Sequence, residues 1–385
     1  MDAIKFSKIL SDKHISDFKK LKYKYSNDFN EFVEILKSSY YEYLPIKDFK
    51  GKDLVYLKSS TGVNLSTVKL LYTHQNSAYG AKALEDEIMA TSAIESIDFS
   101  RDSVRKILKG YAPKDEEENR ILGLKNGFEF IGNKDNKITE ENIYKLYMMS
   151  IGDFLDDEDK LIADNYYRHD SVYVMSDKIE HSGISAGMLP SYMSSLVSFA
   201  NSDDNINELL KATMLHFYIA YIHPYFDGNG RMARLIHMWY LIQKGYETTL
   251  FIPFSNYIEK SRKKYYDAYT LVEENSKLSG VLDITPFLLY FNENVYDKMV
   301  EKEVKTNTLE EYNSALTQGK ITQKEAQLWQ FVLSAYSGES FTTKQLEKDF
   351  GDAAFATVRS FVLKFTDLGL LEATKMKNKV LYRIK

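Results

Sequence analysis

The sequence predicts a mainly α-helical protein. Apolar residues recur at helical spacing through most of the 385 residues. Only 18 Gly and 6 Pro interrupt the chain, as is typical of long helices with short connections. With 44% hydrophobic and 27% charged residues, the composition is that of a globular protein, and the length allows two or three domains.

Capping residues place the first helices. In the first 114 residues we expect several helices, one of them over 83–97. The polar run 114–119, rich in Asp and Glu, is typical of the solvated start of a further helix. Thr139, an N-cap residue followed by Glu140 and Glu141, predicts the next one, because acidic side chains are stabilised at the positive end of the helix dipole.

A short strand and two more helices follow. Residues 171–174, Ser-Val-Tyr-Val, predict the strand. After a glycine-containing segment, helical spacing returns from Pro190 and again over about 205–222. The second helix ends at His223, because Pro224 disfavours helical geometry in the residue before it.

The C-terminal part has a different pattern. Two capping boxes, Thr322-x-x-Glu325 and Thr342-x-x-Gln345, open two short helices. A third helix is expected over 353–368, and Gly369 stands where a helix C-terminus favours glycine. Residues 370–384 then predict two strands that turn at 377–379. Three helices followed by a hairpin indicate a winged helix.

Composition and the N-terminus exclude several classes of protein. The absence of Cys excludes disulfides, thiolate catalysis, Cys-ligated zinc and iron–sulfur clusters. Residues 1–13 lack the apolar run and cleavage site of a signal peptide, and the apolar stretch 214–226 is shorter than the ~20 residues of a membrane span. We therefore expect a cytoplasmic protein with no membrane partner. A net charge of -5 does not indicate a polyanion partner for the whole chain.

Residues 223–234, His-Pro-Tyr-Phe-Asp-Gly-Asn-Gly-Arg-Met-Ala-Arg, have the features of a phosphate site. Gly228 and Gly230, around Asn229, allow positive φ, so successive backbone N–H groups can converge on an anion. A helix is expected to start at once, with its positive dipole end toward that anion. Arg231 and Arg234 lie three apart on one helix face and suit an extended polyphosphate.

Two further residues of this segment suit phosphate chemistry. Asp227, at the rim, could hold Mg²⁺ through one carboxylate while phosphates and water complete the octahedron. His223 could act as a base, because an imidazole with an ordinary pKa of ~6.5 is largely neutral at cytoplasmic pH. The neighbouring His216 and His237 lack a second His at i, i+4 and are expected in the core or behind the site.

The same residues have a purely structural interpretation. His223–Pro224 would be a helix stop, the glycine-rich stretch a tight turn, and the two arginines part of a solvated helix face. The joint register of one His, one Asp, two Gly, one Asn and two Arg favours the phosphate site.

The segment from His223 to Arg234 resembles the signature of the Fic family, His-Pro-Phe-x-Asp/Glu-Gly-Asn-Gly-Arg-x-x-Arg. It departs at Tyr225, where the family usually has a core Phe, so the extra hydroxyl needs a partner. The resemblance extends upstream through Tyr167–Arg168 and 172–174. It implies a Fic (Fido) helical core with a β-hairpin flap over 115–305, between an N-terminal helical region (1–114) and the winged helix-turn-helix (306–385).

This resemblance implies an activity: transfer of AMP from ATP to a Tyr, Thr or Ser hydroxyl of a target protein, with release of pyrophosphate. His223 would be the base, and Asp227 would hold Mg²⁺ on the α- and β-phosphates. The phosphates would be bound by Gly228, Asn229, Gly230, Arg231 and, for the γ-phosphate, Arg234. Members that phosphorylate instead have lysine at the position of Gly230. The segment 175–187 resembles the family's flap, which aligns the target by strand addition.

A second match predicts autoinhibition. Thr91-Ser-Ala-Ile-Glu95-Ser96 resembles the family's inhibitory helix, Ser/Thr-x-x-x-Glu-Gly/Asn, in the arrangement where that helix precedes the core. Thr91 and Glu95 are four apart and share a helix face. In the family this Glu pairs with the arginine matching Arg234 and occludes the γ-phosphate position. The departure is Ser96, where Gly or Asn is usual.

Partners beyond ATP and a target protein stay open. From residue 320 onward the chain has 11 Lys and Arg against 7 Asp and Glu, and DNA phosphates could be gripped by Arg359, Lys364, Lys375, Lys377 and Lys379. Winged helices also dock proteins and dimerise, so a homodimer is an alternative. The 29 Tyr make self-modification conceivable. Two other functions remain: another nucleotide or phosphodiester donor on the same scaffold, and a DNA-binding regulator with a nucleotide-sensing core.

Overall fold

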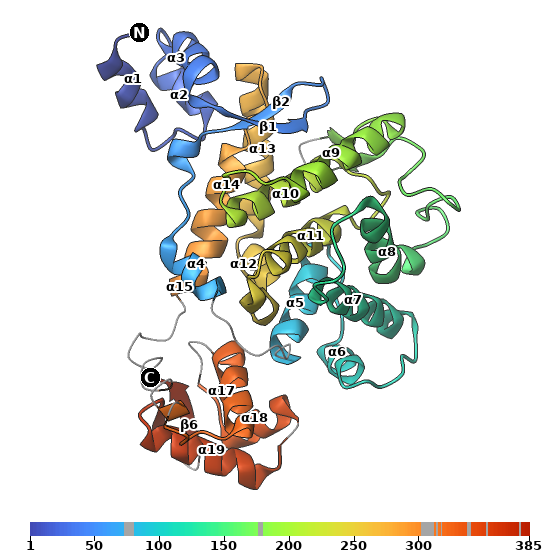
Figure 1. The fold of residues 1–385 in the computed structure, drawn as a ribbon, viewed down its shortest axis with the longest axis vertical. Helices are drawn as coiled ribbons and strands as arrows, with labels where there is room; N and C mark the ends of the chain where they lie inside the picture. Colours follow the sequence, from blue (N-terminus) through green and yellow to red (C-terminus); the bar gives the residue numbers. More distant parts are fainter. Residues whose placement is uncertain are drawn as a thin grey trace.

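The protein is mainly helical in a computed structural model (Figure 1). The structure describes residues 1–72, 81–175, 180–301, 318–336, 340–351, 353–376 and 379–385, together with residues 312, 315 and 316. In the described part of the chain, no helix is long and apolar enough to cross a membrane.

The N-terminal region contains a hairpin as well as helices. Helices α1 (Ala3–Leu10), α2 (Phe18–Lys24) and α3 (Phe29–Ile35) pack around a small core of their own, with Phe18 and Phe29 fully buried. They are followed by the antiparallel strands β1 (Glu42–Lys47) and β2 (Asp53–Tyr56), which the sequence analysis did not predict. In β1 only two apolar residues are buried in alternation, so the strand pattern is too short to stand out.

The central part is a stack of helices with one small hairpin. Its helices are α4 (Leu65–Tyr72), α5 (Ala81–Ile94), α6 (Arg101–Leu108), α7 (Glu116–Gly132), α8 (Glu140–Ser150), α9 (Leu189–Asn201), α10 (Glu208–Ile222), α11 (Asn229–Gln243), α12 (Phe254–Lys260), α13 (Arg262–Ser279), α14 (Thr285–Phe291) and α15 (Asp297–Glu301). Strands β3 (Tyr173–Met175) and β4 (Glu180–Ser182) pair antiparallel at the place of the expected flap, of which residues 176–179 lie outside the described residues.

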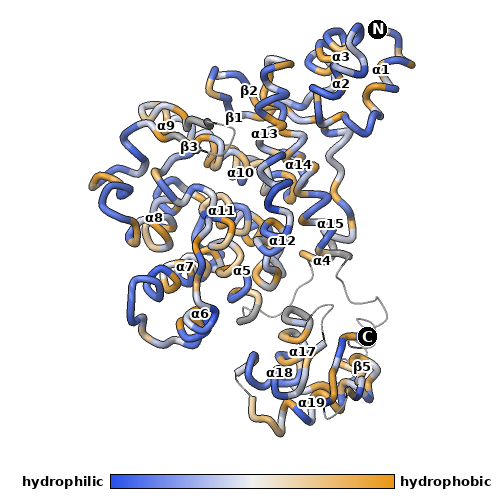
Figure 2. Tube along the Cα trace, turned by 180° about the vertical axis from the view of Figure 1, so that it is seen from behind, coloured by the Kyte–Doolittle hydropathy of each residue, from blue (hydrophilic) through white to orange (hydrophobic). Residues whose placement is uncertain are grey.

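Three predicted helix boundaries in this part are confirmed, whereas the helix expected over 83–97 runs from Ala81 to Ile94. Asp115 caps the acidic first turn of α7, and Thr139 caps α8 by accepting a hydrogen bond from the backbone N–H of Asn142. Helix α10 ends at Ile222, directly before His223–Pro224. The peripheral α6 is amphipathic, with Val104 and Ile107 buried, and polar and apolar residues alternate along it (Figure 2).

Helices α10 and α11 form the centre of the molecule. Nearly every residue of both helices is buried, because other helices cover them on all sides. One hydrophobic core includes them together with Leu84 of α5, Val104 of α6 and Ile121 of α7, so the core is continuous across residue 114. Residues 223–228 connect α10 to α11, which places the signature motif between two deeply buried helices.

The C-terminal part has the predicted order of elements. Helices α17 (Gln323–Ala335) and α18 (Thr343–Phe350) both begin with complete capping boxes. They are followed by α19 (Phe355–Asp367), by Gly369 at φ +75°, and by the antiparallel strands β5 (Leu371–Met376) and β6 (Lys379–Ile384). This part has its own hydrophobic core, and α17 and α18 contact α5.

The cationic residues proposed for DNA contact are not all available. Lys364 donates to both carboxylate oxygens of Glu325 at 2.8 Å, so its charge is neutralised within the C-terminal part. Lys377 lies outside the described residues. Arg359, Lys375 and Lys379 are exposed.

Candidate active site

The loop between α10 and α11 has a special backbone at both ends. His223 caps α10 in the left-handed region, at φ 55° and ψ 66°, which is uncommon for a residue with a side chain. Gly228 has φ +85°, as predicted, and precedes the first turn of α11. The expectation of positive φ at Gly230 is wrong: α11 already begins at Asn229, so Gly230 has helical geometry and another reason to be glycine.

The side chain of Asn229 closes this loop. Its Oδ1 accepts from the backbone N–H of Tyr225 at 3.0 Å, and its Nδ2 donates to the carbonyl of Tyr225 at 2.9 Å. Both ends of the side-chain amide are therefore used within the loop. The group that Asn229 can offer a ligand is its backbone N–H. The N–H groups of the first turn of a helix have no acceptor within the helix, so they point out of its N-terminus.

Tyr225 is fully buried, with its ring stacked on Tyr147 at a centroid distance of 3.6 Å. The hydroxyl of Tyr147 donates to the carbonyl of Asp227 at 3.3 Å. The expectation that the Tyr225 hydroxyl finds a partner is not met, because none lies within hydrogen-bond reach in the described residues. The stack accounts for an aromatic residue at this position but not for the hydroxyl.

Both the ring and the backbone of His223 make hydrogen bonds. Its Nδ1 lies 3.2 Å from the carbonyl oxygen of Ala220, an acceptor that pairs only with a protonated Nδ1. This contact favours the tautomer in which Nε2 is the basic nitrogen. The carbonyl of His223 accepts from Nε of Arg168 at 2.7 Å.

Both arginines of the motif are buried, so the interpretation as a solvated helix face is wrong. Arg231 is 6% exposed, and its Nη2 donates to Oδ2 of Asp227 at 2.7 Å. Burial lowers the pKa of Arg231 despite this partner. Its Nε is buried and has no partner among the residues that the structure describes, so it keeps a donor for a ligand.

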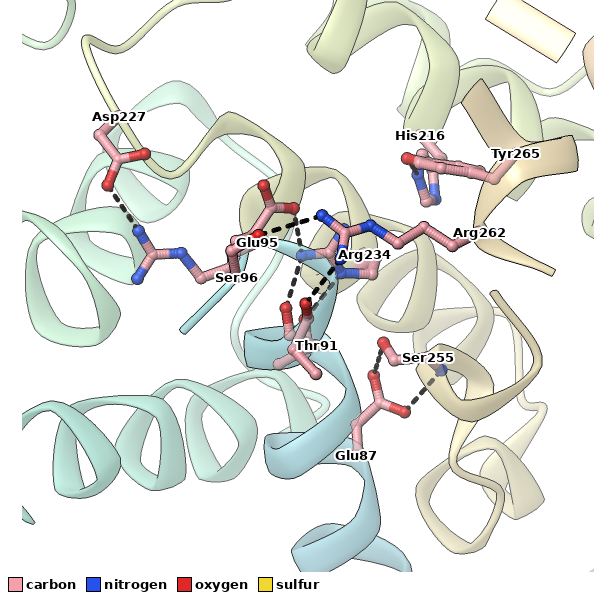
Figure 3. A network of polar contacts seen from close by, with 12 residues as sticks. Glu87, Thr91, Glu95, Ser96, His216, Asp227, Arg234, Ser255, Arg262 and Tyr265 are labelled. Carbon is pink, nitrogen blue, oxygen red and sulfur yellow. Dashed lines mark hydrogen bonds and ion pairs between the residues drawn. The ribbon is translucent and has the colours of Figure 1, made fainter. Parts of the chain in front are cut away.

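Arg234, 3% exposed, is bound to α5 (Figure 3). Its Nε donates to Oγ1 of Thr91 at 2.7 Å, and its Nη2 donates to the Thr91 carbonyl at 3.0 Å and to Oε1 of Glu95 at 2.7 Å. Burial opposes the charge of Arg234, but Glu95 outweighs it, and the pKa of Arg234 is raised. The structure therefore brings together three residues that the sequence separates by up to 143 positions.

The carboxylate of Glu95 also lies against the first turn of α11. A Cβ added to Gly230 would overlap Oε1 of Glu95 and lie 3.0 Å from its Cδ. Gly230 is thus needed for close approach of an anion, not for its backbone conformation. Glu95 places its negative charge where the N-terminus of α11 would attract a phosphate.

One residue that the sequence did not single out holds the end of α5. Arg262, at the start of α13, donates to the carbonyl of Ala93 at 3.3 Å and to Oγ of Ser96 at 3.2 Å. Ser96 has φ 61°, in the left-handed region that Gly and Asn adopt most readily. This backbone requirement explains why Gly or Asn is usual at this position. The preference for Gly or Asn is the signal in the sequence from which a left-handed backbone at residue 96 could have been predicted.

Glu87, one turn before Thr91 on α5, is a second missed residue. Its side chain is 2% exposed and accepts from the backbone N–H of Ser255 at 2.9 Å and from the Ser255 hydroxyl. Burial raises the pKa of Glu87 to about 7, although the two hydrogen bonds and Arg234 oppose the shift.

A cavity of about 210 Å³ adjoins Asp227 and Arg231 and is lined further by α7 and the turn after α8. Within the described ranges, no three His, Asp or Glu side chains come together as a metal site. Asp227 is a half-exposed carboxylate at the rim, and Asp156 and Asp159 line the same cavity. One carboxylate fits Mg²⁺, which usually keeps waters and substrate phosphates as its other ligands.

The two nearby histidines are core residues, as expected. His216 and His237 are buried, and burial lowers the pKa of His237 to about 3 and that of His216 well below its usual value. Their Nε2 atoms lie 2.9 Å from the Tyr265 hydroxyl and 3.2 Å from the Tyr296 hydroxyl, respectively.

Comparisons with known proteins find relatives of this part of the chain. Residues 137–241, which run from α8 through most of α11, match the model of the Fic/DOC family. The chain is 29% identical over 220 residues to the protein adenylyltransferase Fic of Aedes aegypti, covering 54% of this chain and 40% of that protein. It is 28% identical over 227 residues to the protein of the same name from Culex quinquefasciatus, covering 55% and 41%. The chain thus spans about two fifths of the length of these curated relatives.

The fold has been seen in a solved structure. A Fic family protein from Desulfovibrio desulfuricans aligns with a TM-score of 0.51 at 18% identity, over 85% of this chain and 98% of that one. At this low sequence identity, the alignment supports a shared fold and nothing further. The family match, the shared fold and the loop between α10 and α11 agree, and residues 137–241 form a Fic/DOC family domain.

Proposed function

We propose that this protein is a nucleotidyltransferase that moves AMP from ATP to a Tyr, Thr or Ser hydroxyl of a target protein. The observation that carries the proposal is the first part of α11, where the buried Arg231 and Arg234 directly follow the loop that carries His223. Relatives named protein adenylyltransferase support the choice of reaction.

The phosphate groups of ATP bind at the start of α11. The N–H groups of its first turn point at the α- and β-phosphates, and Arg231 adds the buried Nε donor that has no partner in the described residues. Arg234 binds the γ-phosphate once Glu95 has left. Its Nη1 is also buried and lacks a partner in the part of the chain that is described, so the guanidinium has capacity beyond Thr91.

His223 acts as general base. With Nδ1 directed at the carbonyl of Ala220, Nε2 accepts the proton of the target hydroxyl. The hydroxyl oxygen forms a bond to the α-phosphorus, the bond from that phosphorus to the bridging oxygen of the β-phosphate breaks, and pyrophosphate leaves. The loop and α11 contribute by holding the base and the phosphate groups in one rigid frame.

Asp227 is the residue that would hold Mg²⁺. The ion would neutralise charge on the α- and β-phosphates and polarise the α-phosphoryl group. Asp227 already accepts from Arg231, which orients the carboxylate at the rim of the site.

Glu95 acts as the brake. It neutralises Arg234 and occupies the space over Gly230, so a γ-phosphate and the Glu95 carboxylate compete for the same cation and the same helix N-terminus. Thr91 holds Arg234 through a hydroxyl and a carbonyl and keeps the guanidinium in place when Glu95 moves.

The test is label transfer from ATP that carries the label at the α- or the γ-phosphate. Three proteins are compared: wild type, Glu95→Gly, and Glu95→Gly combined with His223→Ala. We expect α-label on protein, strongest in Glu95→Gly and lost with His223→Ala. A coupling of ~1–3 kcal/mol between Glu95 and the nucleotide corresponds to a ~5–150-fold rise in productive binding.

Each other outcome has a clear meaning. Transfer of γ-label would contradict AMP transfer and indicate phosphorylation. Binding of ATP by Glu95→Gly without transfer of either label would point to another nucleotide or phosphodiester donor. Equal transfer by wild type and Glu95→Gly would disprove the brake while leaving the reaction intact.

The role of Asp227 is tested by binding and not by turnover. In the Glu95→Gly background, calorimetry should show tighter ATP binding with Mg²⁺ than with EDTA. Asp227→Asn should remove that difference, because the amide is a poor ligand for Mg²⁺. An unchanged Mg²⁺ effect in Asp227→Asn would contradict the assignment.

A further inference from the structure

We infer that Arg168 is a positioning residue that fixes His223 against the β3–β4 hairpin, and thereby sets the distance between the base and the target segment. The inference rests on the proposed function, in which His223 is the base and the hairpin aligns the target. The residues that carry it are contiguous in space but lie in three separate segments of the chain.

All three guanidinium nitrogens of Arg168 donate hydrogen bonds to backbone carbonyls. Nε donates to the carbonyl of His223 at 2.7 Å, Nη1 to that of Asp170 at 2.5 Å, and Nη2 to that of Ile184. The side chain is 2% exposed, and all three acceptors in the described residues are neutral. Burial lowers the pKa of Arg168, although the negative charge of Asp170 opposes the shift, so burying a cation here is unfavourable and the site needs a specific reason for arginine.

The three acceptors belong to the two ends of the hairpin and to the base. Asp170 lies just before β3, Ile184 lies just after β4, and His223 ends α10. Backbone bonds add to the contact: Arg168 N–H donates to the carbonyl of Pro224 at 2.9 Å, and Ile184 N–H donates to that of Ile222 at 3.3 Å. Both ends of the hairpin are therefore tied to the loop that carries His223.

The backbone of His223 needs this support. Its left-handed conformation is unfavourable for a residue with a side chain and persists only where the surroundings impose it. The bond from Arg168 to the His223 carbonyl is one of the constraints, together with the bond from His223 N–H to Ile219 at 3.1 Å. Loss of the Arg168 bond would let the backbone relax and move the ring away from the carbonyl of Ala220.

Gly183 lets the hairpin approach this closely. A Cβ at Gly183 would lie 2.7 Å from Nη2 of Arg168, 2.9 Å from Cγ1 of Val172 and 3.1 Å from Cβ of His223. Gly183 does not have a positive φ, so alanine there has no backbone penalty and acts only by pushing the three groups apart.

The test uses Arg168→Lys and Gly183→Ala, each in the Glu95→Gly background. Lysine keeps the charge but has one nitrogen in place of three fixed donors. Tyr167→Phe is the matched control, because Tyr167 is the buried neighbour of Arg168 and donates to Glu140, away from His223. Three quantities are measured: kcat for AMP transfer, the Kd of ATP, and the tautomer of His223 from imidazole nitrogen chemical shifts, identified by the signal that His223→Ala removes.

We expect Arg168→Lys and Gly183→Ala to lower kcat, by as much as roughly 10²-fold, because a small misplacement of a reacting group has that effect. The Kd of ATP should stay within about twofold, since the hydrogen bonds of Arg168 and the near neighbours of Gly183 belong to the hairpin segment and the His223 loop. The Nδ1–H tautomer of His223 should lose its predominance. Tyr167→Phe should change none of the three. An unchanged tautomer and kcat in both variants would overturn the inference. The tautomer is read without turnover, so failure of the proposed reaction would not be mistaken for failure of the positioning role.

Discussion

Glu87→Gln should flatten the dependence of the protein's stability on pH between about pH 4.5 and pH 7. Glu87 is buried between α5 and the start of α12, where its two oxygens accept from the N–H and hydroxyl of Ser255. Burial raises its pKa from 4.5 to about 7. The folded protein therefore holds the Glu87 proton more tightly than the unfolded chain does.

The sign and size of the effect follow from this difference. The stability that protonated Glu87 contributes is fully present below about pH 4.5 and is lost as pH rises through about 7. At 1.36 kcal/mol for each unit of pKa, the whole window corresponds to about 3 kcal/mol. Glutamine is neutral at every pH and keeps a carbonyl oxygen for the Ser255 N–H, so the variant lacks this loss.

The assay is urea unfolding, followed by circular dichroism, at half-unit steps from pH 4.5 to pH 8. The free energy of unfolding of wild type should fall relative to that of Glu87→Gln as pH rises, with a slope of about one proton in the steepest part. Glu158→Gln, which removes an exposed carboxylate, is the control and should run parallel to wild type in this range. Parallel curves for wild type and Glu87→Gln would refute the argument from burial.

Three further substitutions test the packing of the site and of the C-terminal part. Gly230→Ala should lower the free energy of unfolding by about 1–3 kcal/mol through overlap with Glu95, and by less in the Glu95→Gly background, which a double-mutant cycle would measure. Tyr225→Phe should leave stability unchanged or raise it, because it removes a buried hydroxyl with no partner among the described residues; a lower melting temperature would reveal a hidden partner. Thr322→Ala should destabilise α17 by about 1 kcal/mol through loss of its capping box, whereas Thr322→Ser, which keeps the cap, should behave as wild type in thermal melts.

Helix boundaries were predictable where local chemistry decides them. The N-caps of α7, α8, α17 and α18, the stop at His223–Pro224 and the positive φ of Gly369 all depend on residues within one or two turns of each other. The β1–β2 hairpin was missed because its short strands depend on contacts with distant helices. Lys364 was assigned to a ligand surface, but its partner Glu325 lies 39 positions away and is not visible as a pair in the sequence.

Gly230 shows the same limit within the candidate site. Its sequence context suggested backbone freedom, whereas the structure assigns its small size to the approach of Glu95 from another helix. Likewise, the sequence offered no reason to single out Glu87, because its raised pKa comes from burial against Ser255, 168 positions away.

The sequence by itself determined the helical class, the caps, and the ordered set of His223, Asp227, Arg231 and Arg234, because these depend on local propensity and on spacing along one loop and one helix turn. Only the tertiary structure decided the direction and environment of those side chains. Burial between packed helices removes water from Arg234 and leaves Glu95 as its counter-charge, and it directs Arg168 at the carbonyl of His223. Such pairings depend on which distant segments share a desolvated space, and that is a property of the packed molecule.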